Sequence, residues 1–334
     1  MAGTWPNLDC GDLVTRVRTY LNEVTSDFYT DAEVYRWLSV AAKDIAQKTL
    51  CVRRILDAVT ASGTRNVTTS CYKVLHVEYI PATGRPVMLT KIDPLKLGHY
   101  PGVTPGTSGS PIYWYEFGSA IGIDPLPDAV YDLRLYVADL PKMQIGTFPI
   151  TDFSSGWTAG AGTGTWTMDG TDASFSGTNG QTETMTWDTA LVATTNYTIT
   201  WTLSAVSAAS HTLTAGGVAA GITFDTNGVH SVNITTSTTA SIVFTGTSTG
   251  TAAMNVDDVY ILKEADFAAV GDQTELDPAW QHLLCIYATY GGLTKDRKYG
   301  PAQMLQSIYN NELAYLRQAL VEVIPDGRNA QKYQ

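Results

Sequence analysis

Apolar residues recur three and four positions apart at both ends of the chain. This spacing predicts four amphipathic helices, over residues 12–24, 30–48, 277–292 and 301–325. The capping box Thr30-Asp-Ala-Glu33 opens the second helix, and Asp277-Pro278 opens the third. Gly291-Gly292 and Pro325 are predicted to end the third and fourth helices. We expect the four helices to bury their apolar sides against one another in an antiparallel bundle.

Between the second helix and the middle of the chain, the apolar period changes to two. Apolar and polar residues alternate in Tyr131-Asp-Leu-Arg-Leu-Tyr-Val137, as in a strand with one buried face. The strands predicted in this part cover residues 74–80, 86–89, 112–117, 120–123 and 131–138. The Pro and Gly turns between His99 and Ser110 predict an extended loop, of a kind that often contacts a partner. We therefore expect a β-rich arm.

A second β-rich segment follows the arm. Tyr197, Ile199, Trp201 and Leu203 fall on one side of a predicted strand, and threonines fall on the other. Strands bounded by Gly, Asn or Ser are predicted over residues 164–168, 173–176, 183–187, 196–203, 211–215, 230–234, 240–245 and 255–262. Short strands in this number predict a β-sandwich.

Composition separates this segment from the rest of the chain. No Lys or Arg occurs between Lys142 and Lys263, and the segment's eight acidic residues supply -8 of the net charge of -11. We predict an α+β multi-domain protein, in which an antiparallel helix bundle with a β-hairpin or sheet arm is interrupted by an inserted all-β, jelly-roll-like sandwich. The predicted limits are 1–146 for the helices and arm, 147–262 for the sandwich and 263–334 for the C-terminal helix pair.

Charge and cysteine content exclude several classes of function. The net charge of -11 argues against a protein that binds nucleic acid through its phosphates, because that affinity comes mostly from Lys and Arg. The cysteines, Cys10, Cys51, Cys71 and Cys285, have neither CxxC spacing nor a nearby His, and they predict buried thiols. No signal peptide or membrane-spanning stretch is visible, so we expect a soluble protein without a membrane partner.

Motifs of catalysis are missing from the sequence. The histidines, His76, His99, His211, His230 and His282, lie in different segments and do not show metal-binding spacing. The nucleophile-elbow, phosphate-loop and dinucleotide-binding patterns are also missing. Gly160-Ala-Gly-Thr-Gly164 predicts a turn, because neither a helix nor a Lys follows it. We predict a protein that is not an enzyme, with no catalytic residue and no cofactor.

Two sets of residues are weaker candidates for binding. Asp257 and Asp258 could supply oxygen ligands to a calcium ion, although neighbouring strand residues face opposite sides and only one of the two would then reach it. Otherwise no metal site is predicted. Trp157, Trp166 and Trp187 would stack against a sugar if their rings were exposed, whereas buried rings would belong to the sandwich core.

Several elements outside the sandwich occur in an order that is familiar from one family. They are the helices at 13–24 and 30–48, Gly109-Ser-Pro-Ile-Tyr-Trp-Tyr115, Ile121-Gly-Ile-Asp-Pro-Leu-Pro-Asp128 with the strand at 131–136, and Leu276-Asp-Pro-Ala-Trp280. This set resembles the head-to-tail adaptor, or head-completion, proteins of tailed bacteriophages. The sandwich is an addition to that pattern, and its Asn255-Val-Asp-Asp-Val-Tyr-Ile261 resembles the last strand of carbohydrate-binding-module-like jelly rolls.

The resemblance implies a structural virion protein of the neck or tail region, assembled in the host cytoplasm. It implies a closed ring of about twelve copies that joins the portal protein to a tail tube or nozzle protein. Genomic DNA would pass through the ring without specific binding. The alternative is a glycan-binding or surface-adhesion protein that acts through the sandwich.

Overall fold

The computed structural model describes residues 8–23, 28–69, 71–81, 83–96, 107–118, 120–144, 153, 155–170, 172–263, 266–268 and 270–323. The chain divides into two compact units. The first unit contains residues 1–53, 138–144 and 264–334, and the second contains residues 54–137 and 145–263. The chain thus leaves the first unit twice. The units group the arm with the sandwich, whereas the sequence groups it with the helices; the domain limits at 146 and 262 stay a prediction.

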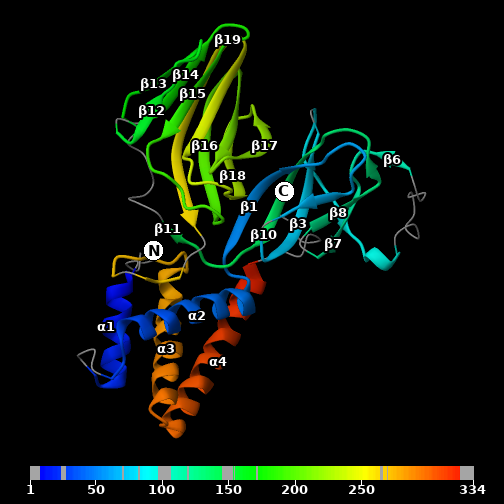
Figure 1. Cartoon of the computed structure of the whole chain (residues 1–334). Coiled ribbons are helices and arrows are strands. Elements are labelled where there is room, and N and C mark those ends of the chain that lie inside the picture. The colour runs from blue at the N-terminus through cyan, green and yellow to red at the C-terminus, as the bar shows by residue number, and fades with distance from the viewer. Residues whose placement is uncertain are drawn as a thin grey trace. The chain divides into compact units, whose positions relative to one another are not determined.

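Helices form the first unit, as Figure 1 shows. They are α1 (Cys10–Leu21), α2 (Asp31–Thr49), α3 (Gln281–Lys295) and α4 (Tyr299–Val323), with the short η2 (Pro278–Trp280) before α3 and the two-residue strand β11 (Met143–Gln144). α3 packs against α1, α2 and α4. Leu13, Leu38 and Leu283, which the helical spacing places inward, are fully buried in the shared core. The predicted helices are therefore confirmed within the described part of the chain.

Local capping explains where the helices begin. The Thr30 hydroxyl accepts from the Glu33 N–H at 3.3 Å, and the Glu33 carboxylate accepts from the Thr30 N–H at 3.0 Å, which confirms the predicted capping box. The Lys295 ammonium also bonds to Glu33, and this hydrogen bond is the main cause of the lowered pKa of the Glu33 carboxyl. α3 begins after a 3-10 turn that Asp277 caps through the Ala279 N–H at 2.8 Å.

The predicted end of the third helix is wrong. α3 continues through Gly291-Gly292 to Lys295. A Cβ at Gly291 would lie 3.1 Å from the Trp37 ring, and one at Gly292 would lie 2.8 Å from Leu21. These glycines therefore allow α3 to approach its neighbouring helices closely, and they do not terminate it. Pro325, the predicted end of the fourth helix, lies outside the described residues.

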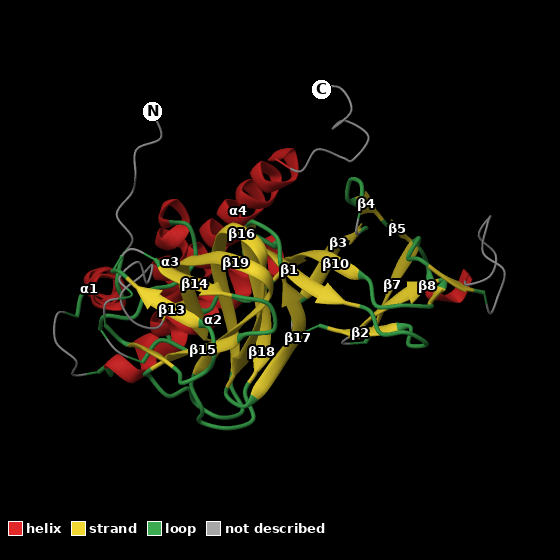
Figure 2. Cartoon of the chain, turned by 90° about the horizontal axis from the view of Figure 1, so that it is seen from above, coloured by secondary structure: helices red, strands yellow, loops and turns green. Residues whose placement is uncertain are grey.

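The arm belongs to the second unit and contains small sheets, visible in Figure 2. One has the order β1-β10-β3-β4, made of β1 (Arg53–Val59), β10 (Asp132–Ala138), β3 (Lys73–Ile80) and β4 (Val87–Met88). Another has the order β2-β8-β7-β5, made of β2 (Asn66–Thr68), β8 (Ala120–Asp124), β7 (Tyr113–Phe117) and β5 (Thr90–Lys91). The turn η1 (Pro94–Lys96) and the paired β6 (Ser108–Gly109) and β9 (Leu126–Pro127) complete it.

Five strands predicted in the arm are confirmed, and the structure adds others. β1, β2, β5, β6 and β9 lie outside the predicted strands, because each is short or does not alternate in its hydrophobicity. Trp114, Ile123 and Leu135 lie in a core that the arm's sheets share. Residues 97–106, most of the predicted extended loop, lie outside the described part of the chain.

The sandwich is built around two long strands, which lie side by side in Figure 1. They are β16 (Asn196–Ala215) and β19 (Ile242–Lys263). β12 (Trp157–Ala159), β15 (Thr182–Trp187), β14 (Ala173–Gly177) and β13 (Thr165–Met168) extend the sheet beyond β19. β17 (Val218–Phe224) and β18 (Gly228–Thr235) pair with β16. All of these pairings are antiparallel.

Two pairs of predicted strands are in fact continuous strands. The segments predicted at 196–203 and 211–215 both belong to β16, and those at 240–245 and 255–262 both belong to β19. β16 shifts register between them, and Ala205 and Ala208 have positive φ values of 54° and 47°. The sequence between the predicted strands therefore marks irregular positions within one strand. The inward side of β16 is as predicted, with Tyr197, Ile199 and Trp201 buried.

Candidate functional site

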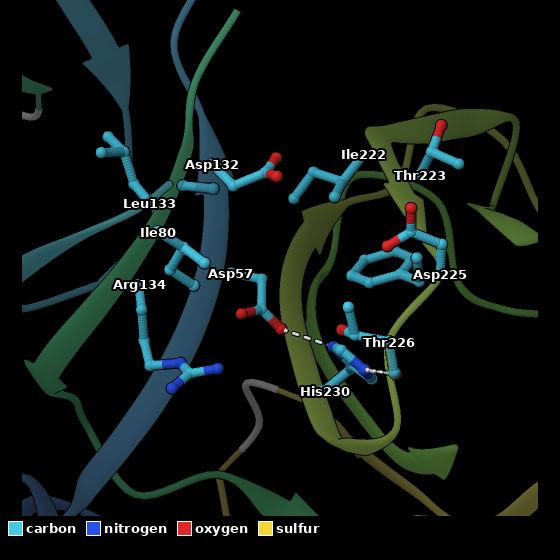
Figure 3. A pocket seen from close by; sticks show the side chains of 12 residues that line it. Asp57, Ile80, Asp132, Leu133, Arg134, Ile222, Thr223, Asp225, Thr226 and His230 are labelled. Carbon is cyan, nitrogen blue, oxygen red and sulfur yellow. Dashed lines mark hydrogen bonds and ion pairs between the residues drawn. The ribbon is translucent and has the colours of Figure 1, made fainter. Parts of the chain in front are cut away.

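A small cleft lies inside the second unit, where the arm meets the sandwich. Figure 3 shows Asp132, Leu133 and Arg134 of the arm on one side and Ile222, Thr223 and Asp225 of the sandwich on the other. Ile80, Thr226, Asp57 and His230 also line the cleft. Polar and ionisable side chains from four strands and the loop after β17 thus converge at one place.

His230 and Asp57 join the two sides of the cleft. The His230 Nδ1 atom lies 3.2 Å from the Asp57 carboxylate, and its Nε2 atom lies 2.9 Å from the Thr226 carbonyl oxygen. Both partners are hydrogen-bond acceptors, so both contacts form at once only when each ring nitrogen carries a proton. The Ser231 N–H also donates to Asp57, at 3.3 Å. The pair therefore satisfies the geometry of an imidazolium–carboxylate ion pair between arm and sandwich.

Strand geometry places these two residues. His230 lies opposite Trp201 in the pairing of β18 with β16, and its ring packs against the rings of Trp201 and Phe224 with centroids 6.0 and 5.1 Å apart. Asp57 lies on β1, next to the buried Leu56. Neighbouring strand residues face opposite sides, so burial of Leu56 in the arm core directs Asp57 outward from that core. The outward side of β1 in the arm therefore meets the sandwich at the His230 ring.

The remaining carboxylates make the cleft acidic. Burial, followed by the charges of Asp225 and Asp57, raises the pKa of Asp132 above its ordinary value. Both ring nitrogens of His230 are already engaged, Nδ1 by the Asp57 carboxylate and Nε2 by the Thr226 carbonyl, so neither is placed to take a proton from a nucleophile. Within the described ranges, no group of three or more His, Cys, Asp or Glu residues could hold a metal ion. The contacts of Asp57 with His230 and Ser231 therefore hold the sandwich against the arm.

Replacing the Asp57 carboxylate tests this contact between the arm and the sandwich. We expect Asp57→Ala to lower the free energy of unfolding by about 1–3 kcal/mol, because the His230 and Ser231 donors lose their acceptor in a largely buried place. Hydrogen exchange in β18 should also become faster. Asp225→Ala is the matched control, since Asp225 lines the same cleft but is exposed. Equal exchange rates in the two variants would contradict the role assigned to Asp57.

The calcium candidates form a bulge in β19. Asp258 has a positive φ of 49°, and its N–H donates to the Asp257 carboxylate at 2.7 Å. The pairing of β16 with β19 shifts register at this point. Asp257 also faces Asp172, whose pKa is raised mainly by burial and then by Asp169 and Asp257. The carboxylate of Asp257 thus already accepts a hydrogen bond from the backbone of its own strand. Calcium binding stays a prediction.

The tryptophans considered for glycan contact belong to the sandwich core. Trp157, Trp166 and Trp187 are 7%, 4% and 8% exposed. Trp157 packs against Trp187 and Phe244, and the Trp166 N–H donates to the Glu183 carbonyl at 3.1 Å. Stacking on a sugar needs an open ring face. Burial therefore gives these residues a structural role, and a glycan contact through them gains no support.

The predicted turn at Gly160–Gly164 covers a buried acidic side chain. Glu183 is 5% exposed, and a Cβ at Gly160 would come within 2.7 Å of its carboxylate. The Gly160 and Gly164 N–H groups donate to the carbonyls of Thr184 and Thr182 at 2.7 and 3.1 Å. The glycines thus let the backbone lie directly on β15.

Sequence reasoning missed the pairing of His230 with Asp57. The two residues are 173 positions apart, and neither lies in a recognisable motif. It also missed His211, which is fully buried, with its ring 5.1 Å from Phe224 and 5.5 Å from Trp201. The alternation of the strand predicted at 211–215 is a signal that could have placed His211 inward, because Leu213 and Ala215 face the core. No local signal could have found Asp57.

Residues 8–161 match the model of a family described as SU10 adaptor protein. No curated protein matches the chain. The matched residues include α1, α2, the strands of the arm and the beginning of the sandwich.

Solved structures are similar to part of the chain at low identity. A low-affinity xylan-binding module from Roseburia intestinalis is 11% identical over 38% of this chain and 100% of its own, with a TM-score of 0.28. The enzymatically active domain of tailspike protein 4 from bacteriophage CBA120 is 12% identical over 36% of this chain and 21% of its own, with a TM-score of 0.27. The N-terminal cellulose-binding domain of Cellulomonas fimi β-1,4-glucanase C is 15% identical over 37% and 99%, with a TM-score of 0.25.

Proposed function

We propose that the protein forms the adaptor ring between the portal and the tail of a bacteriophage, because residues 8–161 match the model of the SU10 adaptor protein family. The family indicates a structural, non-enzymatic role in a phage. That match carries the proposal, and it agrees with the resemblance visible in the helices and the arm. The proposed ring contains about twelve copies and lies in the neck of the virion.

Partners follow from this position. The portal protein lies on one side of the ring, a tail tube or nozzle protein lies on the other, and genomic DNA passes through the centre. A net charge of -11 supports passage without tight binding, because a mainly acidic surface repels phosphates. Among the residues that the structure describes, no helix is long and apolar enough to cross a membrane.

Co-assembly with the portal tests the proposed function. The full chain, mixed with purified portal rings of the same phage, is expected to sediment with them and to add a ring of matching symmetry in electron micrographs. A matched mixture with the capsid protein of that phage should show no binding. Chains that stay free of the portal at every concentration would overturn the proposal. Glycan binding is not proposed as a second function, since the candidate tryptophans are buried.

A further inference from the structure

We propose that the outward side of α4 is the surface on which a second copy of this chain packs. α4 contacts α3 and α2 through a narrow inner stripe, in which Ala302, Tyr309, Leu313 and Leu316 are buried. On another side of the helix, Met304 and Tyr315 are each 66% exposed, and Ile308 lies between them half-buried. These three residues are four and seven positions apart, so they form one apolar stripe away from the buried one. The inference rests on the proposed ring and names the contact that would build it.

The composition of α4 is that of an interface helix. α4, at 25 residues, carries three Asp, Glu, Lys or Arg residues, of which only Glu312 lies before Arg317, whereas α2, at 19 residues, carries six. The exposed positions are instead filled with the amides Gln303, Gln306, Asn310 and Asn311. Solvent-facing helix surfaces normally carry many charges, while the cores of protein interfaces lack charge and are enriched in Tyr and Met.

This lack of charge favours a second copy over a charged partner. Two copies of a protein with a net charge of -11 repel each other, and their contact therefore requires a face with few like charges. DNA or a strongly charged protein would be recognised through several complementary charges, whereas Glu312 is the one charged side chain that the described residues place next to the stripe. A nearly neutral face is compatible with a copy of itself or with another neutral face of the same chain.

The stripe side of α4 supplies part of the area that a stable contact needs. The outward side of α4, about 37 Å long, offers on the order of 400 Å², while a standard interface buries about 800 Å² per partner. A cleft lined by Tyr287, Tyr290, Gln306 and Asn310 among others lies between α2, α3 and α4, on the side of α4 away from the stripe, because Gln306 and Asn310 are each two positions from Ile308. Its floor is fixed by Asp44, which accepts from the Tyr309 hydroxyl at 2.7 Å and the Lys48 ammonium at 2.8 Å. The stripe side therefore covers about half of that area, and neighbouring surface of the two copies supplies the rest.

Matched substitutions on neighbouring residues test the inference. We expect Met304→Glu and Tyr315→Glu each to raise the protein concentration needed for half-assembly by tenfold or more, as measured by native mass spectrometry of the full chain. Gln303→Glu adds the same charge one position from Met304, but away from the stripe, and should change that concentration less than twofold. Circular dichroism should show unchanged helix content in all three variants, because all three positions are exposed.

The outcomes separate this inference from the proposed function. Rings of unchanged stability in both Met304→Glu and Tyr315→Glu would overturn the role of α4, and portal binding by those rings would leave the adaptor function intact. An equal effect of Gln303→Glu would also overturn it. Chains that remain monomeric with or without the portal would overturn the inference together with the ring. Wild-type rings that assemble but ignore the portal would contradict the adaptor function and leave α4 as the contact between copies.

Discussion

Lowering the pH from about 6.5 to 5 is expected to cost the second unit about 2 kcal/mol of unfolding free energy through His211 alone. Burial lowers the pKa of His211 from 6.5 to about 3, with a smaller contribution from His230. Between these values the unfolded chain binds a proton at this residue and the folded chain does not. Stability is therefore complete above about pH 6.5 and decreases as the pH falls towards 3. Urea unfolding at several pH values, followed by tryptophan fluorescence, measures the slope.

His211→Phe isolates the contribution of this residue. The ring lies among Trp201, Phe224 and Phe244, and neither of its nitrogens has a hydrogen-bond partner among the described residues. A phenylalanine should therefore fit with little loss and should flatten the pH dependence. His76→Phe, at an exposed position on β3 of the same unit, should leave the slope near that of the wild type. An unchanged slope in His211→Phe would contradict the assignment.

Lys142→Met is expected to lower the unfolding free energy of the helical unit by about 3–5 kcal/mol. The Lys142 ammonium is 1% exposed and lies 3.1 Å from the carboxylate of Asp139, which is also buried. Removing the cation alone leaves a buried negative charge. The double variant Asp139→Leu with Lys142→Met should be less destabilised than Lys142→Met, because neither charge then remains. Urea unfolding followed by helical circular dichroism measures both changes.

Lys48→Met is the matched control for this prediction. The Lys48 ammonium lies 2.8 Å from Asp44, but its side chain is 53% exposed. Exposed pairs contribute at most about 1 kcal/mol, since water solvates each charge when its partner is removed. If Lys142→Met loses no more unfolding free energy than Lys48→Met, burial does not strengthen the ion pair of Lys142 with Asp139.

Periodic segments were predictable from the sequence because their signal is local. The capping box at Thr30 and the inward side of β16 are set by residues a few positions apart, and both are confirmed. Gly291-Gly292 was misread for the same reason. The helix-ending preference of glycine is a local property, whereas the need for contact with Trp37 and Leu21 depends on helices from the other end of the chain.

The cleft of the second unit was beyond local prediction. Asp57 and His230 belong to segments whose patterns are each consistent with an ordinary strand, and their pairing depends on how arm and sandwich pack. The burial of Trp157 and Trp187 also depends on residues distant in sequence. The pairing of β12 with β15 places the two tryptophans opposite each other. A sequence shows that such a residue is aromatic, but its accessible surface depends on which strands cover it.

By itself, the sequence determined the helices, most strands of the sandwich, its absence of cations over residues 143–262 and the resemblance to adaptor proteins. These properties depend on residue type and short-range spacing. Only the tertiary structure decided that Lys142 is buried, that His211 must stay neutral and that, among the described residues, Met304 and Tyr315 of α4 are exposed. The physical reason is that desolvation and contact are set by neighbours distant in the chain. A charge or an apolar stripe has its energetic effect only once those neighbours are in place.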